Sequence, residues 1–175
     1  MIAKIITNII LIISLAIAQI ALISGLPGII SGLNLVLVVL IFILGFSGLD
    51  FAVWWAVGIG FFMEIFSFLP FGAYILSLSL TVIAANFLLD YFFTNRSLYS
   101  FLALTGLATV IYELIINFFI LIFTEINSSA SIADSNFWLS LLERAGLNLL
   151  SAFIIYYIIY FLGRSLKPVF LIKKY

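Results

Sequence analysis

Long apolar runs, broken at intervals by short polar or turn-forming segments, dominate this chain of 175 residues. Hydrophobic residues make up 66% of the chain and charged residues 8%, whereas a soluble domain is about 45–50% apolar and about 25% charged. A soluble fold of this size has too little interior to hide so much apolar surface. The sequence therefore predicts an all-α polytopic membrane protein. It excludes a soluble enzyme and a nucleic-acid-binding protein.

The apolar runs divide the chain into membrane spans. A run of about 18 or more apolar residues is long enough to cross a bilayer as a helix. We predict one integral membrane domain over residues 1–175, with about six helices in one bundle; five spans is the alternative count. The predicted spans are residues 5–23, 29–46, 51–68, 70–89, 98–123 and 145–162.

Two helix starts depend on local signals. Ala16-Ile17-Ala18 before Gln19 resembles a signal-peptidase site. The run stays apolar through Leu26, however, so we expect a retained first helix rather than a cleaved one. Pro70 is predicted in the first turn of the fourth span, where its missing N–H costs little.

The last span has an ambiguous beginning. Asp134 and Ser135 are both suitable N-cap residues, and a helix from there to Leu162 is longer than a straight crossing requires. We therefore predict a short interfacial helix over residues 136–144 and a bend near Gly146. The preceding segment, residues 124–136, is the one sizeable polar loop in the sequence.

The positive charges predict an orientation. With six spans both termini lie on one side of the membrane, and the side with more Lys and Arg faces the cytoplasm. We expect a multi-pass protein of the cell membrane with both termini cytoplasmic. The other side receives Arg144, while the side of the termini receives Lys4, Arg96, Arg164, Lys167, Lys173 and Lys174.

Two carboxylates fall inside predicted spans. Glu64 and Glu113 lie thirteen and fifteen residues beyond Phe51 and Leu98, which places both at a depth of roughly 20 Å. Such a pair could share a proton, bind a cation or accept hydrogen bonds from a partner. The alternative is that each only fixes packing, through neighbours such as Tyr112, Asn117 or Asn148. We favour packing, because no basic residue is predicted at that depth.

Other intramembrane positions suggest contacts between helices. Asn86, Asn117 and Asn148 are predicted to hydrogen-bond across helices. Gly58 and Gly60 are predicted to allow close approach of a neighbouring helix. These positions, together with Glu64 and Glu113, are the candidate sites for intramembrane polar or partner contacts.

Several residue types that carry chemistry are missing. The chain has no Cys and no His, which removes thiolate ligands, the commonest metal ligand and the usual proton shuttle. It has no phosphate-binding P-loop and no nucleophile elbow. We therefore predict no catalytic residues, no cofactor and no metal site.

The middle of the chain resembles the rod shape-determining protein MreD family. The segment that carries the resemblance is Gly58-Ile59-Gly60-Phe61-Phe62-Met63-Glu64-Ile65-Phe66-Ser67, followed by Pro70-Phe71-Gly72-Ala73-Tyr74. The family has Asp at the positions corresponding to Glu64 and Glu113. The resemblance implies a non-catalytic membrane scaffold of the bacterial cell-elongation and peptidoglycan-synthesis complex. It implies an MreC-like protein, an MreB-like filament and peptidoglycan synthases as partners, within the lipid bilayer.

Two other functions remain as alternatives. The six-helix organisation is also similar to the substrate-binding membrane subunits of energy-coupling-factor vitamin transporters. In that case Glu64, Glu113, Asn117 and Asn148 would line a ligand pocket. A membrane enzyme acting on lipid or cell-wall precursors is the least favoured, because such sites need several charged groups for phosphate or metal.

Overall fold

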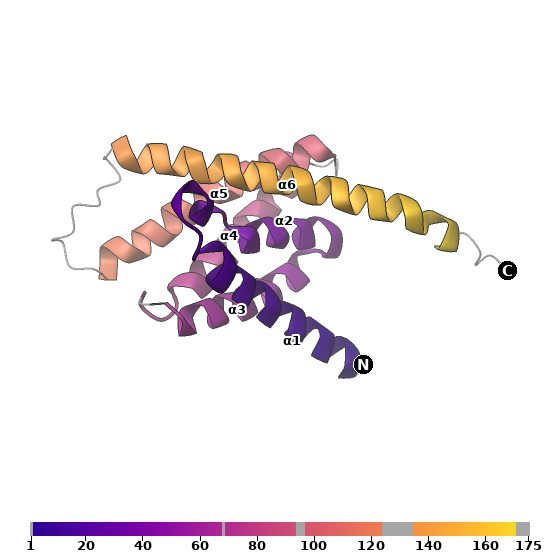
Figure 1. The fold of residues 1–175 in the computed structure, drawn as a ribbon, viewed down its shortest axis with the longest axis horizontal. Helices are drawn as coiled ribbons and strands as arrows, with labels where there is room; N and C mark the ends of the chain where they lie inside the picture. The colour runs from indigo at the N-terminus through magenta and orange to yellow at the C-terminus, as the bar shows by residue number, and fades with distance from the viewer. Residues whose placement is uncertain (1, 68, 94–96, 124–134, 171–175) are drawn as a thin grey trace.

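The computed structural model describes residues 2–67, 69–93, 97–123 and 135–170, and every regular element in these ranges is helical (Figure 1). The protein is an all-α polytopic membrane bundle. A π-helix, η1 (Ala18–Ile23), continues the first α-helix, and a 3₁₀-helix, η2 (Gly28–Gly32), precedes the second. The six α-helices are α1 (Ile2–Ile17), α2 (Leu35–Ser47), α3 (Leu49–Ile65), α4 (Ala73–Tyr91), α5 (Leu98–Phe123) and α6 (Ser135–Phe170).

Five helical stretches are long and apolar enough to span a membrane. They include α1 with η1, η2 with α2, α4, α5 and most of α6. Helix α3 has 17 residues and is therefore about 26 Å long, a little short of the hydrocarbon thickness of about 30 Å. It nevertheless packs between α1, α2 and α4, so six α-helices build the bundle.

Two helix starts differ from the predicted spans by several residues. Helix α2 begins at Leu35, because Asn34 caps it and residues 28–32 form the separate 3₁₀-helix. Helix α4 begins at Ala73 rather than at Pro70, because Gly72 adopts a left-handed conformation (φ 103°) immediately before it. Helix α5 has the predicted bounds.

The predicted division of the last span is wrong. Residues 135–170 form one continuous helix, α6, with no separate interfacial helix over 136–144 and no bend at Gly146 (Figure 1). The helix continues through the Glu143-Arg144 pair, with apolar residues on both sides of it, and Gly146 keeps helical geometry. Residues 124–134 of the predicted polar loop and the last basic residues, Lys173 and Lys174, lie outside the described residues. Residues 135 and 136 of that loop belong to α6.

Helix α2 is the centre of the bundle. It contacts α3, α4, α5 and α6. Its residues are apolar on all sides of the helix, which is the pattern of a helix buried all round. Several of its side chains are fully buried, namely Val36, Leu37, Val38, Leu40 and Ile41.

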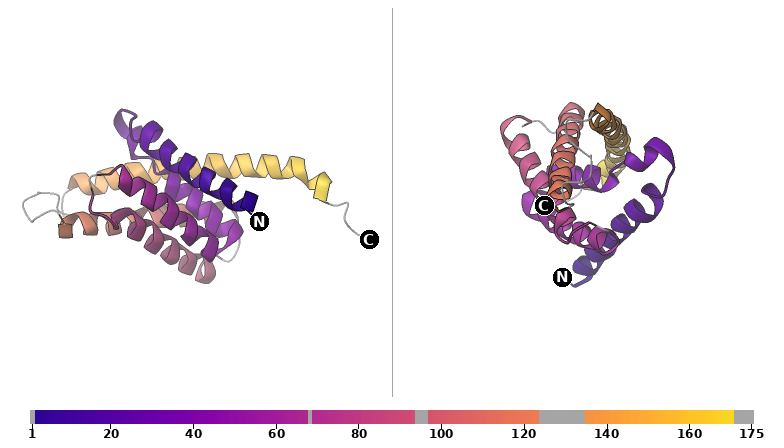
Figure 2. Two further views of the ribbon diagram at one scale, coloured as in Figure 1. Left: turned by 90° about the horizontal axis from the view of Figure 1, so that it is seen from below. Right: turned by 90° about the vertical axis from the view of Figure 1, so that its left-hand side faces the viewer.

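Helix α1 lies at the periphery and runs obliquely across α3 (Figures 1 and 2). The contact passes through Gly58, where an added Cβ would meet the side chain of Ile12 at 3.2 Å. Helix α1 also exposes several isoleucines, including Ile5, Ile6, Ile9 and Ile10. In a bilayer this surface faces lipid or another protein.

Candidate functional site

Buried polar side chains gather at one end of the bundle, which we call the polar end. The antiparallel order of the helices brings together here η1, the beginning of α2, the end of α3, the beginning of α4, the part of α5 from Thr109 onward and the early half of α6 (Figure 1, left). The buried polar residues in these segments include Gln19, Glu64, Thr109, Glu113 and Asn148. Most of the sequence-predicted polar positions thus lie at this end.

An ion pair joins α5 to α6 at the polar end. Nη1 of Arg144 donates to both carboxylate oxygens of Glu113, at 2.9 Å and 2.8 Å. The Glu113 side chain is 8% exposed and that of Arg144 is 44% exposed. The expectation that no basic residue lies at this depth is wrong. Because α6 is continuous, Arg144 lies inside the bundle. Its distance from the start of α6 is about the same as the distance of Glu113 from the end of α5, so the two residues lie at a similar depth.

Asn148 links three helices one turn deeper than Arg144. Its side-chain nitrogen donates to Oγ1 of Thr109 at 3.0 Å, and its Oδ1 accepts from the backbone N–H of Asn34 at 2.8 Å. The Asn34 side chain in turn accepts from the N–H of Leu37 and caps α2. A single buried amide therefore fixes α6 against α5 and against the beginning of α2.

The connection between α1 and α2 is held by Gln19, a residue that the sequence analysis did not identify as part of a site. Its amide nitrogen donates to the carbonyl of Leu33 at 2.9 Å, and its Oε1 accepts from the N–H of Leu35 at 2.9 Å. Gln19 is 5% exposed. A lone amide inside an apolar run was the available signal, since such a group needs partners within the membrane.

The clamped connection reaches the ion pair. At Gly32, at the end of η2, an added Cβ would meet Cγ of Arg144 at 3.0 Å. The stem of Arg144 therefore packs under the connection while its guanidinium pairs with Glu113. The ion pair, Asn148 and Gln19 together tie the beginning of α2 to α5 and α6.

Replacing Asn148 by alanine is expected to lower the stability of the protein by about 1 kcal/mol, because hydrogen bonds between membrane helices contribute about that much. The loss leaves the N–H of Asn34 without its acceptor. Asn117→Ala is the matched control, since among the described residues the Asn117 side chain donates to the carbonyl of Glu113 in its own helix and to no other helix. Thermal unfolding of the detergent-purified variants measures both. An equal loss in the two variants would contradict a cross-linking role for Asn148.

Glu64 caps the beginning of α4 from the end of α3. Its Oε1 accepts from the backbone N–H of Gly72 at 2.8 Å and from that of Ile75 at 3.1 Å. These are two of the donors that the first turn of a helix leaves unpaired, and a carboxylate at this end also complements the helix dipole. Its Oε2 is buried and has no hydrogen-bond partner among the residues that the structure describes.

Gly60 lies one turn before Glu64 on the same face of α3. An added Cβ there would meet the Ile75 backbone, at 2.8 Å from Cα and 2.9 Å from N. The absence of a side chain at residue 60 brings α4 close enough for Glu64 to reach its first turn. Gly60 and Glu64 therefore form one contact between α3 and α4.

Replacing Glu64 by leucine is expected to cost about 1–2 kcal/mol, because two partly buried N–H groups lose their acceptor. Glu64→Gln retains a side-chain oxygen and is expected to cost less than half as much. Thermal unfolding in detergent compares the two variants. If glutamine destabilised the protein as much as leucine, the negative charge rather than the hydrogen bonds would be the important property.

Glu64 and Glu113 have separate partners. The first pairs with backbone donors of α4 and the second with Arg144 on α6. Within the part of the chain that the structure describes, no hydrogen bond joins the two side chains. The Asn86 side chain donates to Asp90 within α4. Among the residues described, no group of three Asp, Glu, His or Cys side chains could hold a metal ion.

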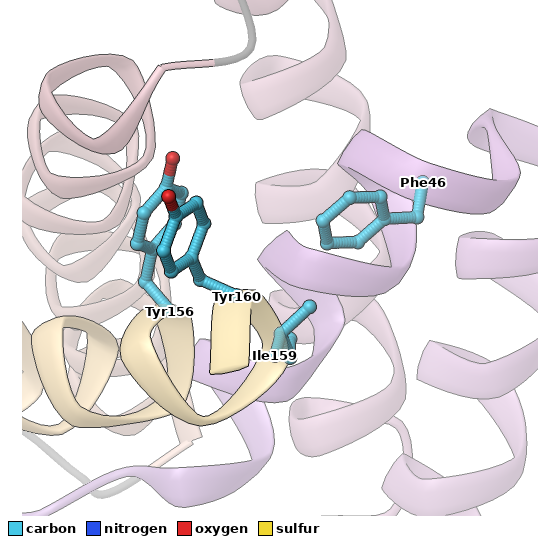
Figure 3. A pocket seen from close by; sticks show the side chains of 4 residues that line it. All are labelled: Phe46, Tyr156, Ile159 and Tyr160. Carbon is cyan, nitrogen blue, oxygen red and sulfur yellow. The ribbon is translucent and has the colours of Figure 1, made fainter. Parts of the chain in front are cut away.

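An apolar groove lies away from the polar end, between the later half of α2 and α6. One part of it, about 260 Å³, is lined by Val39, Phe42, Ile43, Phe46, Ser47, Ile155 and Ile159. A second part, about 180 Å³, is lined by Phe46, Tyr156, Ile159 and Tyr160 (Figure 3). The two parts share Phe46 and Ile159 and so form one surface, which we call the α2–α6 groove.

Comparison with known proteins adds no relative to this description. The chain matches no protein-family model, no curated protein and no solved structure.

Proposed function

We propose that this protein is a non-catalytic membrane scaffold with an MreD-like role in the bacterial cell-elongation complex. The observation that carries the proposal is the use of the two intramembrane glutamates. Both are engaged in contacts that hold helices of this chain together, Glu64 with the beginning of α4 and Glu113 with Arg144. We expect charged groups to take part in internal contacts in a scaffold, which binds its partners through the surfaces of its helices.

The resemblance of residues 58–74 supports the particular complex. In that segment the small residue Gly60 and the polar residue Glu64 make the closest contacts to α4. They act there as one structural unit. An MreC-like protein, an MreB-like filament and peptidoglycan synthases are the proposed partners. The exposed isoleucine face of α1 is the surface best suited to a partner helix, because α3 alone among the α-helices contacts α1 extensively.

The proposed location is the cytoplasmic membrane with both termini in the cytoplasm. The excess of Lys and Arg on the side of the termini supports this orientation. The polar end then faces the outside. Arg144, the basic residue on that side, is paired with Glu113, so it adds little to the opposing charge.

A second candidate is a substrate-binding subunit of an energy-coupling-factor-type transporter. One observation favours it: polar side chains from η1, α2, α5 and α6 gather at the polar end, beneath the connection that Gln19 holds. The hydrogen bonds between these groups count against it. A ligand entering there would have to displace contacts that the bundle itself uses.

Substituting Glu64 and Glu113 by glutamine, singly and together, separates the two functions. For a scaffold we expect a variant that still assembles to keep its partners. Where partner binding weakens, we expect the loss to follow the loss of stability of the variant. For a transporter subunit we expect assembly with an ATPase module to continue while substrate uptake fails. Uptake loss in a variant that is as stable as the original protein would contradict the scaffold proposal.

A further inference from the structure

The α2–α6 groove has a rigid aromatic wall. The ring of Phe101 from α5 stacks on Phe42 at a centroid distance of 4.8 Å and on Phe46 at 5.5 Å. Tyr156 lies against the same ring at 6.1 Å. Gly45 makes this possible, because an added Cβ there would collide with Phe101. These stacked rings support one wall of the groove from behind.

The size of the groove distinguishes between its possible occupants. The lining positions on α2 run from Val39 to Ser47, a rise of about 12 Å. A transmembrane helix of that length and about 10 Å in width would displace roughly 900 Å³. A single hydrocarbon chain about 4 Å wide, from ordinary carbon–carbon contact distances, would displace roughly 150 Å³. The volume of about 260 Å³ is enough to hold one hydrocarbon chain within the groove, whereas a helix could only lie across it.

One end of the groove is polar. The hydroxyls of Tyr156 and Tyr160 point in the same direction beside each other, and Phe46 faces them from α2 (Figure 3). Tyr160 lies one turn before Arg164, the first charged residue after the apolar part of α6, near the depth at which a tyrosine hydroxyl meets lipid headgroups. Two phenol O–H groups at that depth can donate to a phosphate or ester oxygen.

Positive charge follows the two tyrosines along the chain. Helix α6 continues to Phe170, and Arg164 and Lys167 follow Tyr160 by four and seven residues. This spacing keeps positions on one side of a helix. Basic residues just beyond a span attract anionic headgroups. In the sequence, cationic positions therefore follow the two hydroxyl donors along α6.

We propose that the α2–α6 groove binds one acyl chain of an anionic phospholipid from the surrounding bilayer. The chain lies against Phe46, Ile43 and Ile159. The phosphate meets the hydroxyls of Tyr156 and Tyr160. This lipid site goes beyond the proposed scaffold function and does not depend on it, because it uses the opposite end of the bundle from Glu64 and Glu113.

The test is native mass spectrometry of the delipidated full-length protein in maltoside detergent, titrated with dioleoyl-phosphatidylglycerol or dioleoyl-phosphatidylcholine. We expect one molecule of the anionic lipid to be retained preferentially. Tyr156→Phe with Tyr160→Phe keeps both rings and is expected to weaken its binding about ten-fold, the effect of losing hydrogen bonds to a charged group. Ile43→Phe fills the groove and is expected to abolish preferential retention.

Tyr157→Phe is the matched control. Tyr157 lies on the same helix, is half exposed and does not line the groove, so its substitution is expected to leave lipid retention unchanged. The proposal is overturned if the Ile43→Phe protein or the double tyrosine variant retains phosphatidylglycerol as strongly as the Tyr157→Phe protein. Equal retention of the two lipids by the original protein would overturn it as well.

Discussion

Replacing Gly60 by leucine is expected to prevent the chain from forming a stable bundle, with a cost of more than about 3 kcal/mol. A leucine side chain must begin where the backbone of Ile75 already lies, 2.8–2.9 Å from the position of its Cβ. Overpacking of this kind against a fixed backbone forces helices apart. Separating α3 from α4 would also remove Glu64 from the N–H groups that it caps. The measurement is the yield of monodisperse protein after extraction in mild detergent.

Two other glycines provide controls for this prediction. A Cβ at Gly58 would meet only side-chain atoms of Ile12, at 3.2–3.3 Å, and a Cβ at Gly146 would meet nothing within 4 Å. Alanine is therefore expected to cost about 1–3 kcal/mol at Gly60, less at Gly58, and nothing at Gly146, where it favours the helix. A Gly58→Ala protein less stable than Gly60→Ala would show that the α1–α3 contact is the tighter one.

Replacing Arg144 by leucine is expected to cost about 3 kcal/mol, the second largest effect. Glu113 is buried and pairs with this guanidinium through both oxygens. Without it, a carboxylate must remain in a low-dielectric environment or take up a proton. The half-exposed position of Arg144 keeps the cost at the lower end of the range for buried pairs, about 3–5 kcal/mol. Thermal unfolding in detergent gives the value.

A double-mutant cycle isolates the ion pair from the loss of side-chain packing. Glu113→Gln with Arg144→Leu is expected to be more stable than Arg144→Leu alone, because no buried charge remains unpaired. Glu113→Gln alone is expected to have the smallest effect, since the amide oxygen still accepts from Arg144. If the double variant were less stable than Arg144→Leu, the carboxylate would be stabilised by groups other than Arg144.

The number and approximate positions of the helices follow from the sequence, because apolar runs bounded by polar or glycine-rich segments are a local property. Helix α5 has the bounds that were predicted. The value of Gly60 as a close-contact position was also predictable from the spacing of small residues in an apolar span. The spacing alone does not identify the segment that packs against Gly60, which is the α4 backbone at Ile75.

The contacts of the charged residues depend on helices distant in sequence, which local sequence patterns do not specify. The predicted interfacial helix over residues 136–144 places Arg144 at the membrane surface. In the structure α6 continues straight through this segment, and the partner of Arg144 is supplied by α5. The capping role of Glu64 likewise required the left-handed turn at Gly72, which directs the N–H groups of α4 toward α3.

The most direct test of the scaffold account is affinity purification of the tagged protein from its own membranes in mild detergent, with mass spectrometry of the proteins that accompany it. The account predicts recovery of an MreC-like protein together with peptidoglycan synthases. Recovery of ATPase subunits with a transmembrane coupling protein instead would contradict it, and would make the polar side chains around Glu113 and Asn148 candidates for a substrate pocket.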